Sequence, residues 1–294
     1  MNRPTLILLV GICGSGKSTY AKEYIEQHDN TIHLSSDSIR AELWGNEATQ
    51  GDNSEVFSLM QSRAIEALNN GQSVVYDATN ITRKDRSYII TLCPKFAKIE
   101  CHIIWAPIET CIERDAARER TVGKEVIDRM LKWFQAPFYD EGINEIKIVR
   151  PEKFNYAQYL SDIFEAMKIP HDNPHHTLNI YDHCCEAQDY AYKCGKDDTG
   201  LVALAAMVHD AGKPYVKAFV DGKGNTCETA HYYQHHCISA WLAYGMYGAS
   251  VPVNIAWLCS VHMDPFLNTK YYNKLPVYLK KQVDLLHEAD RAAH

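Results

Sequence analysis

The sequence lacks several features that would by themselves define a fold class or a location. Its ten cysteines contain no CxxC pair and no zinc-finger spacing, so we expect most of them to be reduced, buried thiols. The apolar run near the N-terminus, TLILLVG, is too short to span a bilayer and leads directly into a glycine-rich turn. These absences exclude a disulfide scaffold and predict a cytoplasmic protein without a membrane segment.

The sequence also lacks an excess of positive charge, because it has 30 Lys and Arg but 37 Asp and Glu, which gives a net charge of −7. A large non-specific DNA-binding surface needs an overall basic field, so the composition argues against that class and leaves only a local basic cleft. No internal repeat or low-complexity segment is present. The 46% hydrophobic and 23% charged residues are typical of a globular protein, and 294 residues suffice for two cores.

Histidine is rare in the first 170 residues, which hold three, whereas eleven follow from His171 onward. Before about residue 150, short apolar runs alternate with longer amphipathic segments, as in a parallel sheet with crossover helices. The predicted strands are TLILLVG, TIHLS, SVVYD, CHIIW and EIKIV. Later segments have helical spacing. We predict a multidomain protein: an α/β domain with a parallel sheet over residues 1–152, a linker helix over 153–170 and an all-α domain over 171–294.

The clearest motif is GICGSGKST, which fits the P-loop pattern GxxxxGK[ST] between a predicted strand and a predicted helix. In such a loop, backbone N–H groups surround the phosphates, the lysine reaches the β- and γ-phosphates, and the next hydroxyl ligates Mg²⁺. The alternative is a glycine-rich turn without a ligand. We predict binding of ATP and Mg²⁺ by Gly11, Gly14, Ser15, Gly16, Lys17, Ser18 and Thr19.

Polar residues after the second and third predicted strands suit the acceptor side of a phosphotransfer reaction. Asp37 opens a helix, where a carboxylate can accept the proton of an attacking hydroxyl or can simply cap the helix. Arg40 lies three residues later on the same face and is suited to hold a phosphate of the acceptor, although a solvated arginine is the alternative. Asp77, Thr79 and Asn80 end the third strand, where open α/β sheets bind ligands.

Three arginines, Arg114, Arg118 and Arg120, follow on a predicted helix and loop. This is a suitable place for a mobile lid whose arginines neutralise charge during phosphoryl transfer. An exposed helix face with ion pairs is the alternative. Because like charges at i and i+4 repel, Arg114 and Arg118 are easier to explain if they share an anion.

In their order and spacing, GICGSGKST, SSDSIR, YDATNITRKDR and the arginine segment resemble the phage-type 5′-OH polynucleotide kinases over nearly all of residues 1–150. Related P-loop kinases act on small metabolites or on aminoacyl-tRNA. The segment TVGK at 121–124 departs from the proline-containing lid of the phage family. The resemblance implies a P-loop kinase in which Lys17 serves ATP and Ser18 serves Mg²⁺. It also implies that Asp37 acts on the 5′-hydroxyl, Arg40 on the acceptor phosphate and Arg118 on the donor.

The second half contains AMVHDAGKP, in which His209 and Asp210 are adjacent. Adjacent helical residues point about 100° apart, but both can reach one metal ion where a helix end unwinds, and Gly212 and Pro214 favour such an end. A buried, hydrogen-bonded core histidine is the alternative. Mixed imidazole and carboxylate ligands suit Mn²⁺, Ni²⁺, Co²⁺ or Zn²⁺, and two ions can share the aspartate. Further candidate ligands are His183, His235 or His236, His262 and Asp290.

Residues 174–294 resemble the HD phosphohydrolase superfamily through NPHHTLNIYDH, MVHDAGK, YYQHH, VHM and EADRAAH, in that order. These motif sequences are most similar to those of the HD domains attached to tRNA-end-processing nucleotidyltransferases. The position of His236 usually carries an acidic residue in those relatives, and His175 and His176 fit their NPHH turn. The resemblance implies metal ligands at His183, His209, Asp210 and Asp290, a second site with His235 and His262, and a phosphate contact from Lys213.

A domain that adds phosphate and a domain that removes it make sense together on opposite ends of a broken strand. We therefore predict a bifunctional RNA end-healing enzyme that acts on RNA or DNA ends, single-stranded or nicked, with a nucleic-acid ligase as a partner and no membrane association. One alternative is a small-metabolite or nucleoside kinase fused to a nucleotide phosphohydrolase. Another is a nucleotide-binding sensor without turnover.

Overall fold

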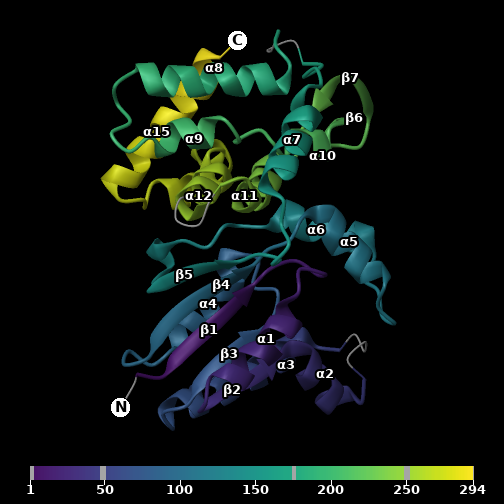
Figure 1. Ribbon diagram of the computed structural model, residues 1–294, viewed down its shortest axis with the longest axis vertical. Helices are drawn as coiled ribbons and strands as arrows, with labels where there is room; N and C mark the ends of the chain where they lie inside the picture. The colour runs from purple at the N-terminus through teal and green to yellow at the C-terminus, as the bar shows by residue number, and fades with distance from the viewer. Residues whose placement is uncertain (1–2, 47–50, 174–176, 248–251, 294) are drawn as a thin grey trace. The chain divides into compact units, whose positions relative to one another are not determined.

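The computed structural model describes residues 3–46, 51–173, 177–247 and 252–293, and the chain divides into two compact units. Unit 1 comprises Met1–Met130 and Pro137–Glu152, and unit 2 comprises Leu131–Ala136 and Lys153–His294. In Figure 1 the ribbon colour changes with residue number through both units. Among the described helices, none is long and apolar enough to cross a membrane.

Unit 1 is built on a five-stranded parallel sheet with the strand order β2-β3-β1-β4-β5. Each strand lies at a predicted apolar run, although β4 begins three residues before the run CHIIW. Parallel strands place all their carboxyl ends at one edge, which is where ligands bind in such sheets. The strands are β1 (Thr5–Val10), β2 (Thr31–Ser35), β3 (Ser73–Asp77), β4 (Lys98–Ile104) and β5 (Glu145–Val149).

Helices connect the strands and cover the sheet, so the central strand β1 is buried over five of its six residues. On one face, Ala21 of the first helix packs against Ile7, Leu9 and Val75 of the sheet. The helices are α1 (Lys17–Gln27), α2 (Ser36–Trp44), α3 (Asn53–Asn69), α4 (Arg83–Leu92), α5 (Ile108–Ala116), α6 (Lys124–Trp133) and the 3₁₀ turn η1 (Tyr139–Glu141).

Unit 2 is mainly helical, and its long helices bring distant histidines together. Helix α8 packs against α9 and α15, and α11 packs against α12 (Figure 1). The predicted linker helix is α7, which contacts α10 and α11 and groups with unit 2. The helices are α7 (Tyr156–Met167), α8 (Ile180–Lys193), α9 (Leu201–Ala206), α10 (Lys213–Val216), α11 (His235–Met246), α12 (Pro252–Val261), α13 (Asp264–Leu267), α14 (Thr269–Tyr272) and α15 (Val277–Ala292).

The prediction of an all-α second domain is wrong in one element, because β6 (Ala218–Val220) and β7 (Thr226–His231) form an antiparallel hairpin. Its turn is fixed by Asp221, whose Oδ1 accepts hydrogen bonds of 2.8 Å from the backbone N–H of Lys223 and of Asn225. The signal was the Asp-Gly pair in VDGKGN, which favours a turn between strands. Apolar alternation identifies neither strand, because β6 has three residues and β7, TCETAH, is mostly polar.

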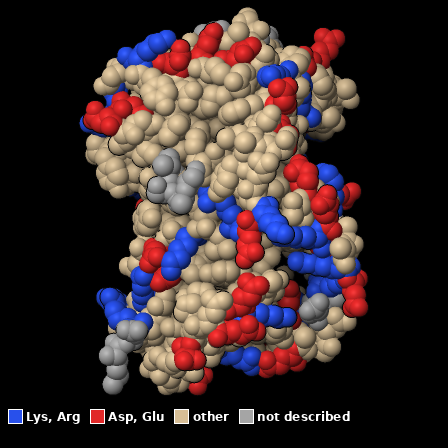
Figure 2. Space-filling view, viewed as in Figure 1, with Lys and Arg blue, Asp and Glu red and all other residues tan. Residues whose placement is uncertain are grey.

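All ten cysteines are free thiols. Five of them are buried and the other five are partly exposed, so burial is less general than the sequence suggested. On the face of the molecule in Figure 2, basic and acidic side chains are interspersed, in agreement with the small net charge.

Candidate active sites

The phosphate loop of unit 1 joins β1 to α1, and its conformation requires glycine at two positions. Gly14 and Gly16 have φ of +80° and +106°, in the left-handed region that L side chains rarely adopt. A Cβ on Gly14 would lie 2.1 Å from the carbonyl oxygen of Cys111. The two glycines thus let the loop turn tightly before the N-terminus of α1, where the helix dipole favours an anion.

Lys17, the first residue of α1, directs its ammonium group back across the loop. Nζ donates to the carbonyl oxygens of Gly11 at 2.9 Å and of Ile12 at 3.0 Å. Burial lowers the pKa of Lys17, while the nearby Cys13 thiol and Asp77 carboxyl act in the opposite direction. A phosphate anion at the loop would favour the charged form in the same way.

The loop opens into a cavity of about 1140 Å³. Ligand pockets typically measure about 300–1,000 Å³, so this cavity is large enough to hold a nucleotide together with part of a second substrate. Its walls come from the phosphate loop, the start of α2, one face of α3, the end of β3, α4 and the loop after α5. Predicted residues on these walls are Gly14, Gly16, Lys17, Ser18, Asp37, Arg40, Asp77, Thr79, Asn80, Arg118 and Arg120.

Asp37 lies in the first turn of α2 without capping it. The N-cap is Ser35, whose hydroxyl accepts from the N–H of Ser38 at 3.4 Å, so the capping alternative for Asp37 is wrong. The Asp37 side chain is 55% exposed and forms an ion pair with Arg40, Nη1 to Oδ1, at 2.6 Å. Arg40 also donates through Nη2 to Oδ1 of Asn53 at 3.2 Å, which connects it to α3.

The arginine segment divides differently from the prediction. Helix α5 ends at Ala116, so Arg118 lies beyond it and is not stacked one turn after Arg114. Arg114 donates through Nη1 to the carbonyl oxygen of Ser15 at 3.4 Å. Arg118 and Arg120 line the cavity. The end of α5 removes the stacking of Arg114 and Arg118, so their sharing of an anion stays a prediction, and the loop arginines are suited to meet a donor phosphate.

Asp115 is a residue that sequence reasoning missed. It is 2% exposed, and its carboxylate accepts from the N–H of Val122 at 3.0 and 3.2 Å and of Gly123 at 2.9 Å. These bonds close the loop that carries Arg118. An acidic residue in an arginine-rich helix gave no signal that separated it from a surface ion pair.

At the end of β3, Asp77 and Asn80 have different roles. The carboxylate of Asp77 lies 3.1 Å from Nε2 of His33 and is 4% exposed. Asn80 is buried with φ of +46°, and its Nδ2 donates to the carbonyl oxygen of Leu9 at 2.8 Å. Asn80 thus fixes the strand end, whereas Asp77 presents a carboxylate toward the phosphate loop.

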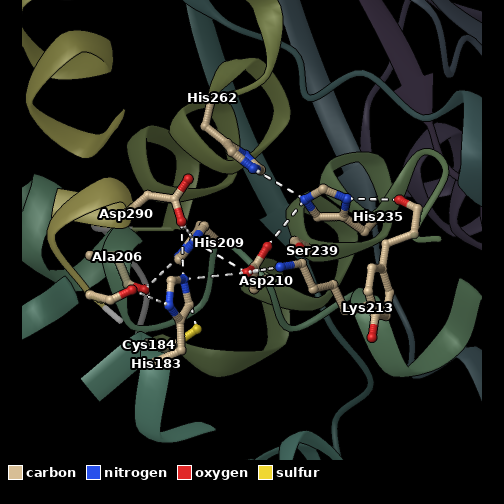
Figure 3. A network of polar contacts seen from close by, with 12 residues as sticks. His183, Cys184, Ala206, His209, Asp210, Lys213, His235, Ser239, His262 and Asp290 are labelled. Atoms are coloured by element: carbon tan, nitrogen blue, oxygen red, sulfur yellow. Dashed lines mark hydrogen bonds and ion pairs between the residues drawn. The ribbon is translucent and has the colours of Figure 1, made fainter. Parts of the chain in front are cut away.

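In unit 2, six predicted side chains converge to form what we call the His–Asp centre (Figure 3). The described residues form two groups, and in each the potential ligand atoms all lie within 4.8 Å of one another. Asp210 belongs to both. The first group is His183, His209, Asp210 and Asp290, and the second is Asp210, His235 and His262.

The adjacency of His209 and Asp210 is explained by where α9 ends. The helix stops at Ala206, so both residues lie in the turns that follow and are not held 100° apart. The next turn is fixed by Gly212, whose N–H donates to the Ser239 hydroxyl at 2.8 Å. A Cβ on Gly212 would lie 2.2 Å from the carbonyl oxygen of His235, so glycine allows α10 and α11 to approach closely.

The four histidines of the centre have the same orientation. In each ring Nδ1 faces a backbone carbonyl oxygen and therefore carries the proton, so the Nε2 lone pair points into the centre. The distances are 3.0 Å from His183 to Ala293, 2.7 Å from His209 to Ala206, 2.9 Å from His235 to Tyr232 and 2.7 Å from His262 to Cys259.

This arrangement directs lone pairs at one another. Nε2 of His235 lies 3.2 Å from Nε2 of His262. Oδ1 of Asp290 lies 3.0 Å from Nε2 of His183 and 3.3 Å from Nε2 of His209. Such contacts are unfavourable unless a proton on Nε2 or a metal cation lies among them, and imidazole with carboxylate is a suitable set for divalent transition metals. The residues present thus fit one or two such ions, with Asp210 between them.

The charges of the centre agree with a site for cations. Burial would raise the pKa of Asp210, but His209 and Lys213 hold it well below its ordinary range. For His209, burial lowers the pKa, yet the Asp210 carboxylate outweighs it and raises the pKa well above the ordinary value. Positive charge is therefore favoured among these ligand atoms.

The remaining histidines lie outside the two groups. His236 is buried, and burial together with its neighbour His235 lowers its pKa to about 3. The His231 ring stacks on Tyr233 at 5.4 Å. His175 and His176 lie outside the described residues. Sequence reasoning missed His171, whose Nε2 lies 3.2 Å from Nζ of Lys213.

Comparison with known proteins finds similarities for the first half of the chain. Residues 6–137 match the family model of an AAA domain. A segment of 149 residues is 26% identical to part of transcription factor bHLH140 of Arabidopsis thaliana and covers 48% of this chain and 15% of that protein. The chain thus spans less than a sixth of that relative.

Solved structures give more distant likenesses. The Pnkp1/Rnl/Hen1 RNA repair complex aligns at 24% identity over 44% of this chain and 43% of that one, with a TM-score of 0.41. A gluconokinase from Sinorhizobium meliloti 1021 aligns at 16% identity over 52% of this chain and 86% of that one, with a TM-score of 0.37. Because neither score reaches 0.5, the assignment rests on the phosphate loop, the strand order and the family match. Together these define an N-terminal parallel-sheet α/β P-loop domain, which implies ATP and Mg²⁺, followed by a helical region.

Proposed function

We propose that the protein heals RNA ends with two activities. Unit 1 is an ATP-dependent kinase that phosphorylates 5′-hydroxyl ends. Unit 2 is an HD-type phosphohydrolase that removes a 3′-phosphate or a 2′,3′-cyclic phosphate. The observation that carries the proposal is the presence, in one chain, of a P-loop cavity with an acceptor wall and a His–Asp centre with two ligand groups.

The kinase assignment is supported by the opposite walls of the cavity. Lys17 and Ser18 lie at the donor end, where Mg²⁺ supplies charge neutralisation between the phosphates. Asp37 lies on the acceptor wall, where its exposed carboxylate can take the proton from a hydroxyl that attacks the γ-phosphate in line. For this, Asp37 has to exchange its contact with Arg40 for the hydroxyl, and Arg40 is then available for the acceptor phosphate.

The phosphohydrolase assignment is supported by the form of the four histidines, whose Nε2 atoms are available as ligands. A divalent ion bound there lowers the pKa of a water molecule and polarises the phosphate. The chain itself supplies the shape of the site: Asp210 joins both ligand groups, Asp290 closes one side, and Lys213 presents a positive charge to a phosphate oxygen.

The two activities are complementary on a cleaved strand. RNA cut by many ribonucleases carries a 5′-hydroxyl and a 3′- or 2′,3′-cyclic phosphate, and a ligase requires the reverse. A nucleic-acid ligase is therefore the class of partner that would use the product, and DNA ends are the corresponding alternative substrate. The domain order and the fold support this function only by analogy, so the proposal rests on the residues of the two sites.

The experiment that tests this proposal compares acceptors and donors of phosphate. With ATP and Mg²⁺, the protein should phosphorylate a 5′-hydroxyl oligoribonucleotide in preference to free nucleosides or sugars. With Mn²⁺, Ni²⁺, Co²⁺ or Zn²⁺, it should release phosphate from a 3′-phosphorylated oligoribonucleotide in preference to a deoxynucleoside triphosphate. Preference for the small molecules in both assays would replace the proposal with a metabolic kinase fused to a nucleotide phosphohydrolase.

A further inference from the structure

Lys213 is a buried cation next to the His–Asp centre, 8% exposed. Its Nζ lies 2.5 Å from Oδ2 of Asp210 and 3.2 Å from Nε2 of His171. The ring of Tyr232 covers it at 5.3 Å. An ammonium group has three N–H donors. Among the residues that the structure describes, Asp210 and His171 face two of them, which leaves one N–H for a substrate oxygen.

His171 is itself 1% exposed, and its proton can be placed from its contacts. Nδ1 lies 2.9 Å from the carbonyl oxygen of Leu178, so Nδ1 carries the hydrogen. Nε2 then presents a lone pair to the Lys213 ammonium. A neutral histidine adds no charge to balance the lysine, for which Asp210 suffices. The lone pair of His171 instead fixes the direction of a second N–H of the Lys213 ammonium group.

The backbone around His171 is held at three consecutive carbonyl groups. Lys217 Nζ donates to the carbonyl oxygen of Pro170 at 2.6 Å. The Tyr232 hydroxyl donates to that of His171, and the N–H of Ala230 to that of Asp172 at 2.9 Å. Ala230 belongs to β7 and Tyr232 follows it, so the hairpin β6–β7 fixes the position of His171.

We propose that His171 is a positioning residue that aims the Lys213 ammonium at a phosphate monoester oxygen beside the His–Asp centre, with the hairpin holding His171 in place. This rests on the proposed phosphohydrolase function only for the identity of the substrate. The alternative role for Lys213 is simple charge balance with Asp210, and that role does not require His171.

The test uses the full-length protein with Mn²⁺ and measures the binding of inorganic phosphate by calorimetry. His171→Asn keeps an amide near Leu178 and is too short to reach Lys213, whereas His171→Gln can place an oxygen near the former Nε2. We expect His171→Asn and Lys213→Met each to weaken phosphate binding on the order of 10-fold, and His171→Gln to stay within about threefold of the wild type. The double variant His171→Asn with Lys213→Met should bind no more weakly than Lys213→Met alone.

Two further measurements separate positioning from damage. Mn²⁺ affinity and thermal unfolding should be alike in His171→Asn and His171→Gln. Tyr232→Phe removes the donor to the His171 carbonyl and keeps the ring over Lys213, so it should weaken phosphate binding partly.

Each outcome decides a different question. Equal phosphate affinity in the wild type and His171→Asn, or no phosphate binding by the Mn²⁺-loaded wild type, overturns the inference. If the expected pattern appears while 3′-phosphorylated RNA is not hydrolysed, the positioning role stands and the proposed function fails. Hydrolysis of that RNA with His171→Asn as active as His171→Gln leaves the function intact and removes the role of His171.

Discussion

Four histidines meet in unit 2 with the same proton placement, and this agreement is more informative than their number. A single buried histidine with a carbonyl partner is ordinary in a protein core. Here the same Nδ1 contact occurs in His183, His209, His235 and His262, and all four Nε2 atoms face Asp210 or each other. A core without a cation would gain nothing from such opposed lone pairs.

Metal stoichiometry tests this arrangement at the level of the residue. His262→Ala removes a ligand of the second group only, so the number of bound Mn²⁺ ions should fall from two to one. Asp210→Asn, which affects both groups, should weaken all binding by at least about 100-fold. The matched control is His236→Ala, since His236 is a buried neighbour outside both groups, and it should retain two ions. Calorimetric titration gives the counts, and an unchanged count in His262→Ala would contradict a two-ion centre.

Asp37 provides a second test at the same scale. Asp37→Asn removes the base without removing a contact to the phosphate loop, so kcat of the kinase should fall about 10²- to 10⁴-fold while the Kd for ATP stays the same. Ser38→Ala, at the next and exposed position, is the control. Parallel loss of ATP affinity in Asp37→Asn would place Asp37 on the donor side instead.

Helices and strands were predictable where a clear pattern of apolar residues ran along them. The strands of unit 1 follow apolar runs, which are buried in β1, β3 and β4 and only partly buried in the edge strands β2 and β5, so both their positions and the parallel sheet followed from the sequence. The β6–β7 hairpin was missed because β6 has three residues and only its turn carried a signal. His171 was missed because it contacts Lys213, which is close only in the fold, and Asp115 was missed because an acidic residue among arginines resembles a surface ion pair.

The junction of α10 and α11 depends on the absence of a side chain at Gly212. Its φ is not in the left-handed region, so Gly212→Ala tests close packing alone, with the new Cβ 2.2 Å from the His235 carbonyl oxygen. We expect a loss of about 2 kcal/mol in the stability of unit 2 together with weaker Mn²⁺ binding. Gly222→Ala is the control, because its nearest atom is the Tyr233 hydroxyl at 3.5 Å. Equal denaturation midpoints for the two variants would disprove the packing role.

Strands β4 and β5 carry an ion cluster that should make unit 1 sensitive to acid. Burial opposes ionisation of Glu100, but hydrogen bonds from Lys147, Lys98 and His102 lower its pKa to about 2, below its ordinary 4.5. A depressed carboxyl pKa adds stability above pH 4.5 that is lost as the pH falls toward 2.

Glu100→Gln removes this contribution, which amounts to about 1–2 kcal/mol after solvent screening. The difference in unfolding free energy between wild type and variant should therefore be constant near neutral pH and fall to about half by pH 3. Urea denaturation at several pH values measures it. Glu145→Gln, at a more exposed carboxyl of the same cluster, should have a smaller effect. A difference of the same size at pH 3 and pH 7 would contradict this account of Glu100.

At the scale of the molecule, each unit holds its own candidate site. The P-loop cavity lies wholly within unit 1 and the His–Asp centre within unit 2, so each can be inactivated without altering the other. The motifs of both sites were visible in the sequence. What required the structure was the placement of Asp37 outside the helix cap, the end of α5 before Arg118, and the shared position of Asp210.

The most direct measurement uses one short RNA with a 5′-hydroxyl and a 2′,3′-cyclic phosphate, incubated with the protein, ATP, Mg²⁺ and Mn²⁺. Mass analysis of both ends should show gain of a 5′-phosphate and loss of the 3′-phosphate. Lys17→Ala should abolish only the first change, and His209→Ala only the second. An RNA unchanged at both ends, or a folded His209→Ala protein that has also lost the kinase, would contradict the account.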